Sequence, residues 1–379
     1  MSSTHPVSSL GTGVAWQPVA TSGQARAGVL HTRHGLVRTP AFMPVATRAT
    51  VKSLTPSEVE STGADLVIMN TYHLWLRPGE DIVQAHGGLH HFAQWPRPIV
   101  TDSGGYQAFS LAARTRVTED GFEFASHLDG TRCLLSPEES MRVQAALGSD
   151  IAMQLDVCPR ADATPAEWVE AVERTTRWAV RCLAARSPTQ AMFGIVQGGT
   201  DIPLRRRHLE TLCELDLDGV ALGGFSVGEP PQHMHDAVSA VAPMMPAHKP
   251  RYLMGVGTPE DLVIAVAAGV DLFDCVLPTR NARNGQAFVS TGRLAIKQAR
   301  YRHDLGPLES GCACATCQGG FTRAYLRHLY MAGEILSHRL LTLHNLQFYG
   351  QLLARARQAI LEDKYARWAE KTLRSLGVR

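Results

Sequence analysis

The chain has 379 residues, of which 45% are hydrophobic and 19% charged, and its formal net charge is +2. This composition is typical of a globular protein with one large or two smaller domains, and it excludes fibrous and disordered chains. No apolar run approaches the roughly twenty residues that span a bilayer, and the first residues lack the charged-then-apolar order of a secretion signal. We therefore expect a cytoplasmic protein with no membrane partner.

Charge is distributed unevenly along the chain. Residues 276–379 contain sixteen Lys and Arg against six Asp and Glu, a net charge of +10, whereas residues 1–275 carry −8. A basic segment of this size indicates a polyanion partner such as nucleic acid, since neutralising phosphates releases counterions. For the residues from about 355 onward, a solvated basic helix surface is an equally good explanation.

The first predicted elements are a polar arm at 1–24 and a β-hairpin at 26–40 that turns at His34-Gly35. Short apolar runs follow, with helical patterns between most of them. The runs cover 41–45, 66–70, 99–102, 151–156, 193–197, 220–223, 252–255 and 272–275. Alternation of about eight strands with helices predicts an α/β fold of the (β/α)8 TIM-barrel class, with a doubly wound sheet as the alternative.

Two helix starts are marked by capping residues. Ser136-Pro137-Glu138-Glu139 and Thr164-Pro165-Ala166-Glu167 both read as capping boxes with proline at the first helical position. After the second start, large side chains recur every three or four residues. They are Trp168, Val172, Thr175, Trp178 and Cys182, and they predict an amphipathic helix.

Polar residues or glycines stand at the carboxyl ends of seven predicted strands. They are Asn70, Asp102, Asp156, Gln197, Gly223-Gly224, Gly255 and Asp274. In a barrel these ends form one rim, where active sites are built. The sequence therefore predicts one site that gathers these groups.

After the last strand we expect a hairpin at 281–297, then Cys312, Cys314 and Cys317, and then long helices from Thr322. His344 completes a Cys3His set suited to a structural zinc, although His328 and His338 also follow, and three free thiols are the alternative. The other five cysteines are scattered, as in a reducing compartment. We expect a barrel core at 25–275, a zinc-binding elaboration of the last βα unit at 276–345, and C-terminal helices at 346–379 that pack back on the barrel.

Two carboxylates stand out by context, Asp102 in Thr-Asp-Ser-Gly-Gly-Tyr-Gln and Asp274 in Leu-Phe-Asp-Cys-Val-Leu-Pro-Thr-Arg. One carboxylate can attack an anomeric carbon while the other transfers a proton to and from the exchanged group. Each also has a structural interpretation. Asp102 suits a turn, and Asp274 suits an ion pair with Arg280 or Arg283.

The neighbouring residues favour a flat, polar, aromatic ligand. Tyr106 and Met254 suit the two faces of a heterocycle, while Asp156, Gln197 and the Gly223-Gly224 backbone suit its edge. Taken singly, Tyr106 reads as a half-buried aromatic residue and Met254 as a core residue. The grouping is what favours a binding site.

These motifs closely resemble the bacterial tRNA-guanine transglycosylases, also called queuine tRNA-ribosyltransferases, from about residue 26 to residue 364. The resemblance rests on the following segments: Thr-Asp-Ser-Gly-Gly-Tyr-Gln at 101–107, Gly-Ile-Val-Gln-Gly-Gly at 194–199, Tyr-Leu-Met-Gly-Val-Gly at 252–257, Leu-Phe-Asp-Cys-Val-Leu-Pro-Thr-Arg at 272–280, Arg-Asn-Gly-Gln-Ala-Phe at 283–288 and Cys-x-Cys-x-x-Cys at 312–317.

The resemblance implies exchange of guanine at the wobble position of GUN-anticodon tRNAs, which read Tyr, His, Asn and Asp codons, for 7-aminomethyl-7-deazaguanine. It implies that Asp274 is the nucleophile on ribose C1′ and Asp102 the proton-transferring partner. It implies one structural zinc on Cys312, Cys314, Cys317 and His344, and a homodimer. The implied base-binding residues are Ser103, Gly104, Gly105, Tyr106, Asp156, Cys158, Gln197, Gly223, Gly224, Phe225 and Met254. The implied RNA-contacting residues are Gly255, Val256, Gly257, Thr258, Pro259, Glu260, Asp261, Thr279, Arg280, Asn281, Ala282 and Arg283.

Cys158 and Val227 are the small pocket residues of bacterial relatives that take the aminomethyl base. The chain departs from many of these relatives at Phe225-Ser226, where they have Leu-Ala, and from some at Thr258, where they have Lys. Two other functions remain open: a non-catalytic RNA-binding subunit, which would lack the nucleophile, and a hydrolase that releases the base to water.

Overall fold

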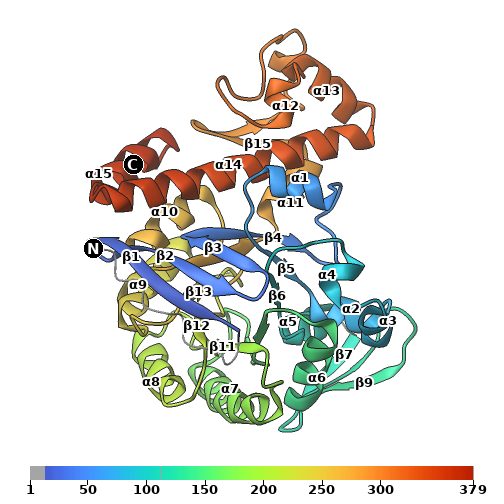
Figure 1. Cartoon of the computed structure of the whole chain (residues 1–379), viewed down its shortest axis with the longest axis vertical. Helices are drawn as coiled ribbons and strands as arrows, with labels where there is room; N and C mark the ends of the chain where they lie inside the picture. Colours follow the sequence, from blue (N-terminus) through green and yellow to red (C-terminus); the bar gives the residue numbers. More distant parts are fainter. Residues whose placement is uncertain (1–12, 112, 379) are drawn as a thin grey trace, which may run out of the picture.

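The computed structural model of the chain describes residues 13–111 and 113–378 (Figure 1). Eight parallel strands close into a barrel, which confirms the predicted fold class and excludes the doubly wound sheet. The last strand pairs with the first, with Leu272 opposite Ala41. The barrel strands are β4 (Ala41–Ala46), β5 (Val67–Met69), β6 (Ile99–Thr101), β10 (Ile151–Met153), β11 (Ala191–Val196), β12 (Gly219–Leu222), β13 (Arg251–Leu253) and β14 (Leu272–Cys275).

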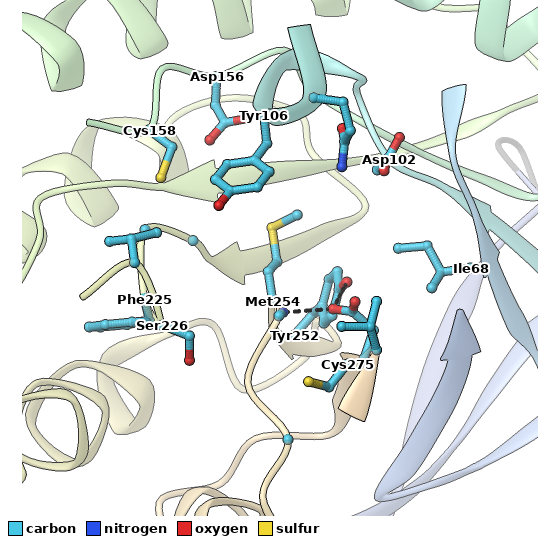
Figure 2. Close-up of a pocket in the computed structure, with 18 of the residues that line it drawn as sticks. Ile68, Asp102, Tyr106, Asp156, Cys158, Phe225, Ser226, Tyr252, Met254 and Cys275 are labelled. Carbon is cyan, nitrogen blue, oxygen red and sulfur yellow. Dashed lines mark hydrogen bonds between the residues drawn. The ribbon is translucent and has the colours of Figure 1, made fainter. Parts of the chain in front are cut away.

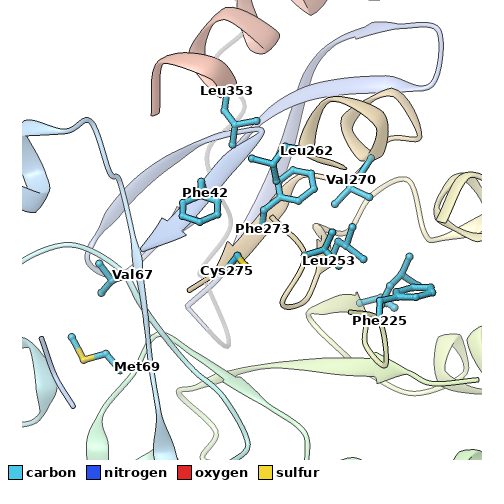
Figure 3. Close-up of a cluster of buried hydrophobic side chains, with 14 of the residues drawn as sticks. Phe42, Val67, Met69, Phe225, Leu253, Leu262, Val270, Phe273, Cys275 and Leu353 are labelled. Carbon is cyan, nitrogen blue, oxygen red and sulfur yellow. The ribbon is translucent and has the colours of Figure 1, made fainter. Parts of the chain in front are cut away.

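Successive side chains of the barrel strands face opposite ways. On β14, Leu272 packs inside the barrel, whereas Phe273 packs outside against the helices. Figure 3 shows Phe273 with Phe42 of β4 and Leu262 and Leu353 of the covering helices. Buried on both sides, these strands read as continuous apolar runs, which is why the sequence reveals them.

Helices cover the outside of the barrel, and most begin at a capping residue or a proline. They are α1 (Pro56–Ser61), α2 (Thr71–Leu76), α3 (Glu80–Ala85), α4 (Leu89–Phe92), α5 (Gly105–Leu111), α6 (Pro137–Leu147), α7 (Pro165–Ala185), α8 (Ile202–Cys213), α9 (Pro231–Val241), the 3-10 turn η1 (Ala242–Met244) and α10 (Pro259–Ala267).

The helix expected after Thr164 is confirmed as α7, and its five predicted apolar-face residues are all buried. Thr164 and Glu167 form a reciprocal capping box. The capping box expected at Ser136 is only half present. Ser136 accepts a hydrogen bond from the Glu139 amide, but the Glu139 carboxylate accepts from Arg142 instead of returning to the cap.

The amino-terminal segment forms a three-stranded antiparallel sheet, β1 (Ala15–Ser22), β2 (Ala25–Thr32) and β3 (Gly35–Thr39). The hairpin predicted at 26–40 is confirmed as β2 and β3. The structure differs over residues 15–22, which we expected to be an irregular arm and which pair with β2. The first twelve residues of that arm lie outside the described part. Trp16, Leu30 and Val37 pack against the inner barrel residues, so this sheet closes the amino end of the barrel.

A buried ion pair joins this sheet to the barrel. Arg26 donates from Nε and Nη2 to the two carboxylate oxygens of Asp271, each at 2.9 Å, and also to the Lys249 and Ala247 carbonyls. Burial raises the pKa of Asp271 to about 6, and the Arg26 guanidinium opposes that rise. The Arg26 guanidinium also lies 3.6 Å from the centre of the Trp16 ring.

Between α5 and α6 the chain forms a second antiparallel sheet, which the sequence analysis did not predict. Its strands are β7 (Ala113–Val117), β8 (Phe122–Ala125) and β9 (Arg132–Leu135). Phe122 and Phe124 are buried on one face of β8, and Glu123 between them is exposed. The sheet is a lateral extension beside the carboxyl end of β6.

Past the barrel, α11 (Leu277–Arg283) leads into the expected hairpin, which starts later than predicted because residues 281–283 belong to the helix. The remaining elements are β15 (Gln286–Val289), β16 (Gly292–Ala295), the 3-10 turn η2 (Ala299–Tyr301), α12 (Ala315–Gln318), α13 (Arg323–Met331), α14 (Ile335–Leu361) and α15 (Tyr365–Ser375). Figure 1 shows α14 running from the lobe of α12 and α13 back across the barrel. The domain division expected between residues 345 and 346 therefore falls inside one continuous helix.

No helix in the part of the chain that the structure describes combines the length and the apolar character needed to cross a bilayer.

We predict that Arg26→Ala lowers the free energy of unfolding by about 3–5 kcal/mol, because it leaves Asp271 buried without its partner. Arg38→Ala is the matched control. Arg38 is 64% exposed and pairs with Asp65, so its loss should cost less than about 1 kcal/mol. Urea unfolding of both variants checks this, and equal losses would contradict the prediction.

Candidate active site and metal centre

A pocket of about 520 Å³ lies at the carboxyl ends of the barrel strands. Figure 2 shows that its lining comes from several strands and the loops that follow them. The structure brings the following candidate residues into its wall: Asp102, Ser103, Gly104, Tyr106, Asp156, Cys158, Gln197, Gly223, Gly224, Phe225, Met254, Gly255, Gly257, Thr258, Asp261, Asp274 and Arg280.

Asp274 stands near the end of β14 and is held by two donors. The Tyr252 hydroxyl donates to its Oδ1 at 2.6 Å, and the Gly255 amide donates to the same oxygen at 2.7 Å. Burial raises the pKa of Asp274, and these two hydrogen bonds oppose the rise. Among the described residues, neither Arg280 nor Arg283 forms an ion pair with Asp274, so the structural interpretation of this residue as an Arg-paired carboxylate is wrong.

Asp102 follows β6 and is fixed at both oxygens. The Thr71 amide donates to Oδ1 at 2.9 Å, and the Asn70 side chain donates to Oδ2. Burial raises the pKa of Asp102 to about 7; the two donors oppose this rise, and the nearby Asp274 carboxylate adds to it. The two carboxylates thus interact, and near neutral pH Asp102 exchanges a proton readily.

A polar edge lies on another wall of the pocket. Gln197 Nε2 donates to Asp156 Oδ2 at 2.6 Å, while Gln197 Oε1 is buried and has no hydrogen-bond partner among the residues that the structure describes. Burial raises the pKa of Asp156 to about 6. An orphaned acceptor beside a carboxyl group suits a ligand edge that carries N–H groups.

The pocket has one open aromatic wall. Tyr106 of α5 is 52% exposed, and Met254 lies in the segment after β13 (Figure 2). Cys158 also lines the pocket, and burial raises the pKa of its thiol to about 12, so the thiol is neutral at physiological pH.

Phe225 lines the pocket but is only 4% exposed. The face of its ring packs against the Arg205 guanidinium, 3.7 Å from the ring centre. Much of the extra bulk at this position is therefore turned into the protein interior.

The structure leaves eight candidate residues out of the pocket wall. They are Gly105, Val256, Pro259, Glu260, Thr279, Asn281, Ala282 and Arg283. Val256, Thr279 and Ala282 are buried. Thr258 caps α10 in a reciprocal box with Asp261, and Asp261 also bonds His235, so both side chains have internal partners.

Sequence reasoning missed Tyr252, whose hydroxyl donates to Asp274. It placed Asn70 on the rim but gave no role to this residue, which donates to Asp102. Strand periodicity could have found Tyr252, because it lies two residues before Met254 and therefore faces the same side of β13. Asn70 was already placed at a strand end, next to the strand that precedes Asp102.

The three cysteines and His344 form one cluster. The Sγ atoms of Cys312, Cys314 and Cys317 lie 3.7, 3.5 and 3.5 Å from His344 Nδ1. In a tetrahedral zinc site with bonds of about 2.3 Å to sulfur and about 2.0 Å to nitrogen, this edge is about 3.5 Å. The four side chains therefore fit a metal ion.

The surroundings of the cluster favour His344 over the other histidines. His344 Nε2 donates to the Phe288 carbonyl at 2.8 Å, which leaves the Nδ1 lone pair facing the sulfurs. His328 and His338 do not belong to the group.

A second group of possible ligands joins the hairpin to the barrel at its amino end. His34 Nδ1 and His90 Nε2 lie 2.7 and 3.1 Å from different oxygens of Asp150, and the two imidazole rings stack. The Ile99 amide also donates to Asp150. With both carboxylate oxygens engaged, we interpret this group as a structural tie.

Comparison with known proteins agrees with this geometry. A model of the family described as queuine tRNA-ribosyltransferase matches residues 21–377. The chain belongs to this family.

Relatives that carry the same name match along most of their length. One from Sorangium cellulosum is 60% identical over 95% of this chain and 92% of its own. One from Herpetosiphon aurantiacus is 51% identical over 91% and 88%. One from Lysinibacillus sphaericus is 50% identical over 93% of each chain. With family membership established, a pocket that contains two interacting carboxylates is the candidate active site.

We predict that Cys314→Ala abolishes metal binding and loosens the lobe of residues 276–345, because three ligands remain where four are needed to close the site. Elemental analysis and limited proteolysis check this. Cys213→Ala, which removes an exposed thiol outside the cluster, should keep both metal and protease resistance. Unchanged metal content in Cys314→Ala would refute the assignment.

Proposed function

We propose that the protein exchanges guanine at the wobble position of GUN-anticodon tRNAs for 7-aminomethyl-7-deazaguanine. The observation that carries this proposal is the pair of half-buried carboxylates that line the pocket. Asp274 is held by two donors that favour its ionised form, while the pKa of Asp102 is raised to about 7. Environments that differ in this way suit a nucleophile and a proton carrier.

In the proposed first step, an Asp274 carboxylate oxygen attacks ribose C1′ and the bond from C1′ to guanine N9 breaks. The departing guanine takes the proton of neutral Asp102. The ribose is then held as an ester of Asp274, which is a covalent enzyme–RNA intermediate.

In the second step, the incoming base gives its N9 proton to the Asp102 carboxylate. Its N9 attacks C1′, the ester bond breaks, and the Asp274 carboxylate is restored. The two steps conserve the proton on Asp102, so the exchange needs no added acid, base or oxidant.

We propose that the polar edge and the two faces of the pocket select the base. Asp156, Gln197 and the Gly223-Gly224 backbone are proposed to bind the ring edge, with Tyr106 and Met254 on its faces. Cys158 and Val227 leave space for an aminomethyl substituent rather than a larger group. A competition assay between guanine, the aminomethyl base and queuine tests this choice.

The RNA is proposed to lie over the mouth of the pocket, along the loops at 255–261 and 279–283. Arg280 is exposed and lines the pocket, and its charge suits a phosphate. We further propose that the metal is zinc, since three thiolates and one imidazole favour a soft or borderline ion in a closed tetrahedral site.

We also propose that the protein acts as a cytoplasmic homodimer. Exposed apolar side chains gather on α13 and the start of α14, where Tyr325, Met331, Ile335 and Leu336 are 41%, 59%, 75% and 37% exposed. A patch of this kind suits a protein partner.

We predict that Asp274→Asn abolishes both exchange of labelled guanine into tRNA and the RNA adduct seen on denaturing gels, because an amide cannot form the ester. Asp65→Asn, which changes a carboxylate outside the pocket, should keep both. An adduct that persists in Asp274→Asn would overturn the nucleophile assignment, and abasic RNA without exchange would favour the hydrolase.

We predict that kcat/KM for tRNA falls as the pH rises through about 7, because Asp102 must be protonated to release guanine. A raised carboxyl pKa means that the active, neutral form dominates below that pH. Asp102→Asn should remove this limb and lower turnover by about 10²- to 10⁴-fold. A wild-type profile that stays level to pH 9 would refute the proton role.

A further inference from the structure

Helix α8 carries a buried arginine, Arg205, on the side that faces the barrel. Arg205 is fully buried, and among the described residues it forms no ion pair. It lies in the first turn of α8 and is the first of three consecutive arginines, of which Arg206 and Arg207 are exposed. A buried guanidinium without a carboxylate is costly, so its hydrogen bonds must offset the lost hydration.

All of those bonds go to the backbone of the two loops that build the polar edge of the pocket. Arg205 donates to the carbonyls of Gly199 at 2.5 Å, Val196 at 3.0 Å and Gly223 at 2.8 Å. The flat face of the guanidinium stacks on the Phe225 ring. One side chain therefore ties the end of β11 to the end of β12.

The peptide before Gln197 is held from both sides by α8. Arg205 bonds its carbonyl, and its amide donates to His208 Nδ1 at 2.9 Å. His208 lies three residues after Arg205, on the same face of α8. The backbone that carries the Gln197 side chain is thus fixed from beneath.

The peptide that joins Gly223 to Gly224 is held at its carbonyl alone. A trans peptide is planar, and its N–H points opposite to its C=O. Because the Gly223 carbonyl points to Arg205 in the interior, the Gly224 N–H points away from the interior. Both glycines line the pocket, and no described residue accepts a hydrogen bond from this N–H.

We propose that Arg205 is a positioning residue for base recognition, which holds the 223–224 peptide so that the Gly224 N–H faces the exocyclic oxygen of a 6-oxopurine. The inference rests on the proposed function and deepens it. The charge on Arg205 also polarises the peptide from its carbonyl side, which makes the N–H a stronger donor. Gly224 adopts φ +69°, and a Cβ there would lie 2.2 Å from Gln197 Oε1, so this geometry requires glycine.

The test compares two free bases, guanine and 2-aminopurine, which lacks the 6-oxo oxygen and, with it, the N1–H of guanine. Asp156 is kept in every variant, so the change in the ratio between proteins reports on the contact to the oxygen. Equilibrium binding by calorimetry gives the ratio of their Kd values for each protein. Wild type should prefer guanine, and Arg205→Met should lose about tenfold of that preference, since the donor is no longer held in place. Arg205→Lys keeps the charge but not the three-way fork and should lose part of it.

Two controls separate positioning from general stability. Arg251→Met removes another buried arginine, which bonds the Met245 and Gly269 carbonyls at the opposite end of the barrel. It should lower Tm and leave the ratio unchanged. Arg206→Met alters the exposed neighbour and should change neither.

An unchanged ratio in both Arg205 variants would overturn the proposal, as would a wild-type protein that binds the two bases equally. If Arg205→Met does not fold, the ratio for Arg205→Lys decides. Failure of the proposed function is seen separately, as loss of guanine exchange and of the RNA adduct in the wild type, which this binding measurement does not use.

Discussion

The site depends on two carboxylates that share one pocket at the carboxyl ends of the barrel strands. Burial raises the pKa of both Asp102 and Asp274 and so disfavours the ionised form of each. The protein offsets this unequally. Asp274 receives the Tyr252 hydroxyl and the Gly255 amide on one oxygen, whereas Asp102 carries the added repulsion of Asp274. The two carboxylates therefore sit in different surroundings, and parallel strands in a closed barrel make this possible by ending at one rim.

Buried arginines do different work at the two ends of the barrel. At the amino end, Arg26 meets the carboxylate of Asp271 and ties the amino-terminal sheet to the strands. At the carboxyl end, the contacts of the Arg205 guanidinium within the described part of the chain are to carbonyls and an aromatic ring. The first arrangement closes the fold. The second leaves positive charge beneath the pocket floor, where it orders the backbone on which the polar edge is built.

Helix α14 connects the metal cluster to the pocket. His344 belongs to the cluster, and Asn345 bonds the Phe288 amide and the Pro278 carbonyl. One turn further on, the Tyr349 hydroxyl donates to the Gly257 carbonyl, in the loop beside Asp274. A metal bound at one point of this helix would therefore also brace the loop that follows β13.

The sequence by itself determined the eight barrel strands, because strands buried on both faces are continuous apolar runs, and it placed Asp102 and Asp274 at their ends. Cysteine spacing likewise indicated three metal ligands. The sequence missed β1, whose residues are mostly exposed. It also missed the sheet at 113–135, because strands of four or five residues are too short to show a clear periodicity. Only tertiary structure decided among three histidines and picked Arg205 out of three adjacent arginines. Those choices depend on which face of a helix packs against its neighbours. The candidates in each set are the same type of residue, so residue type does not distinguish them.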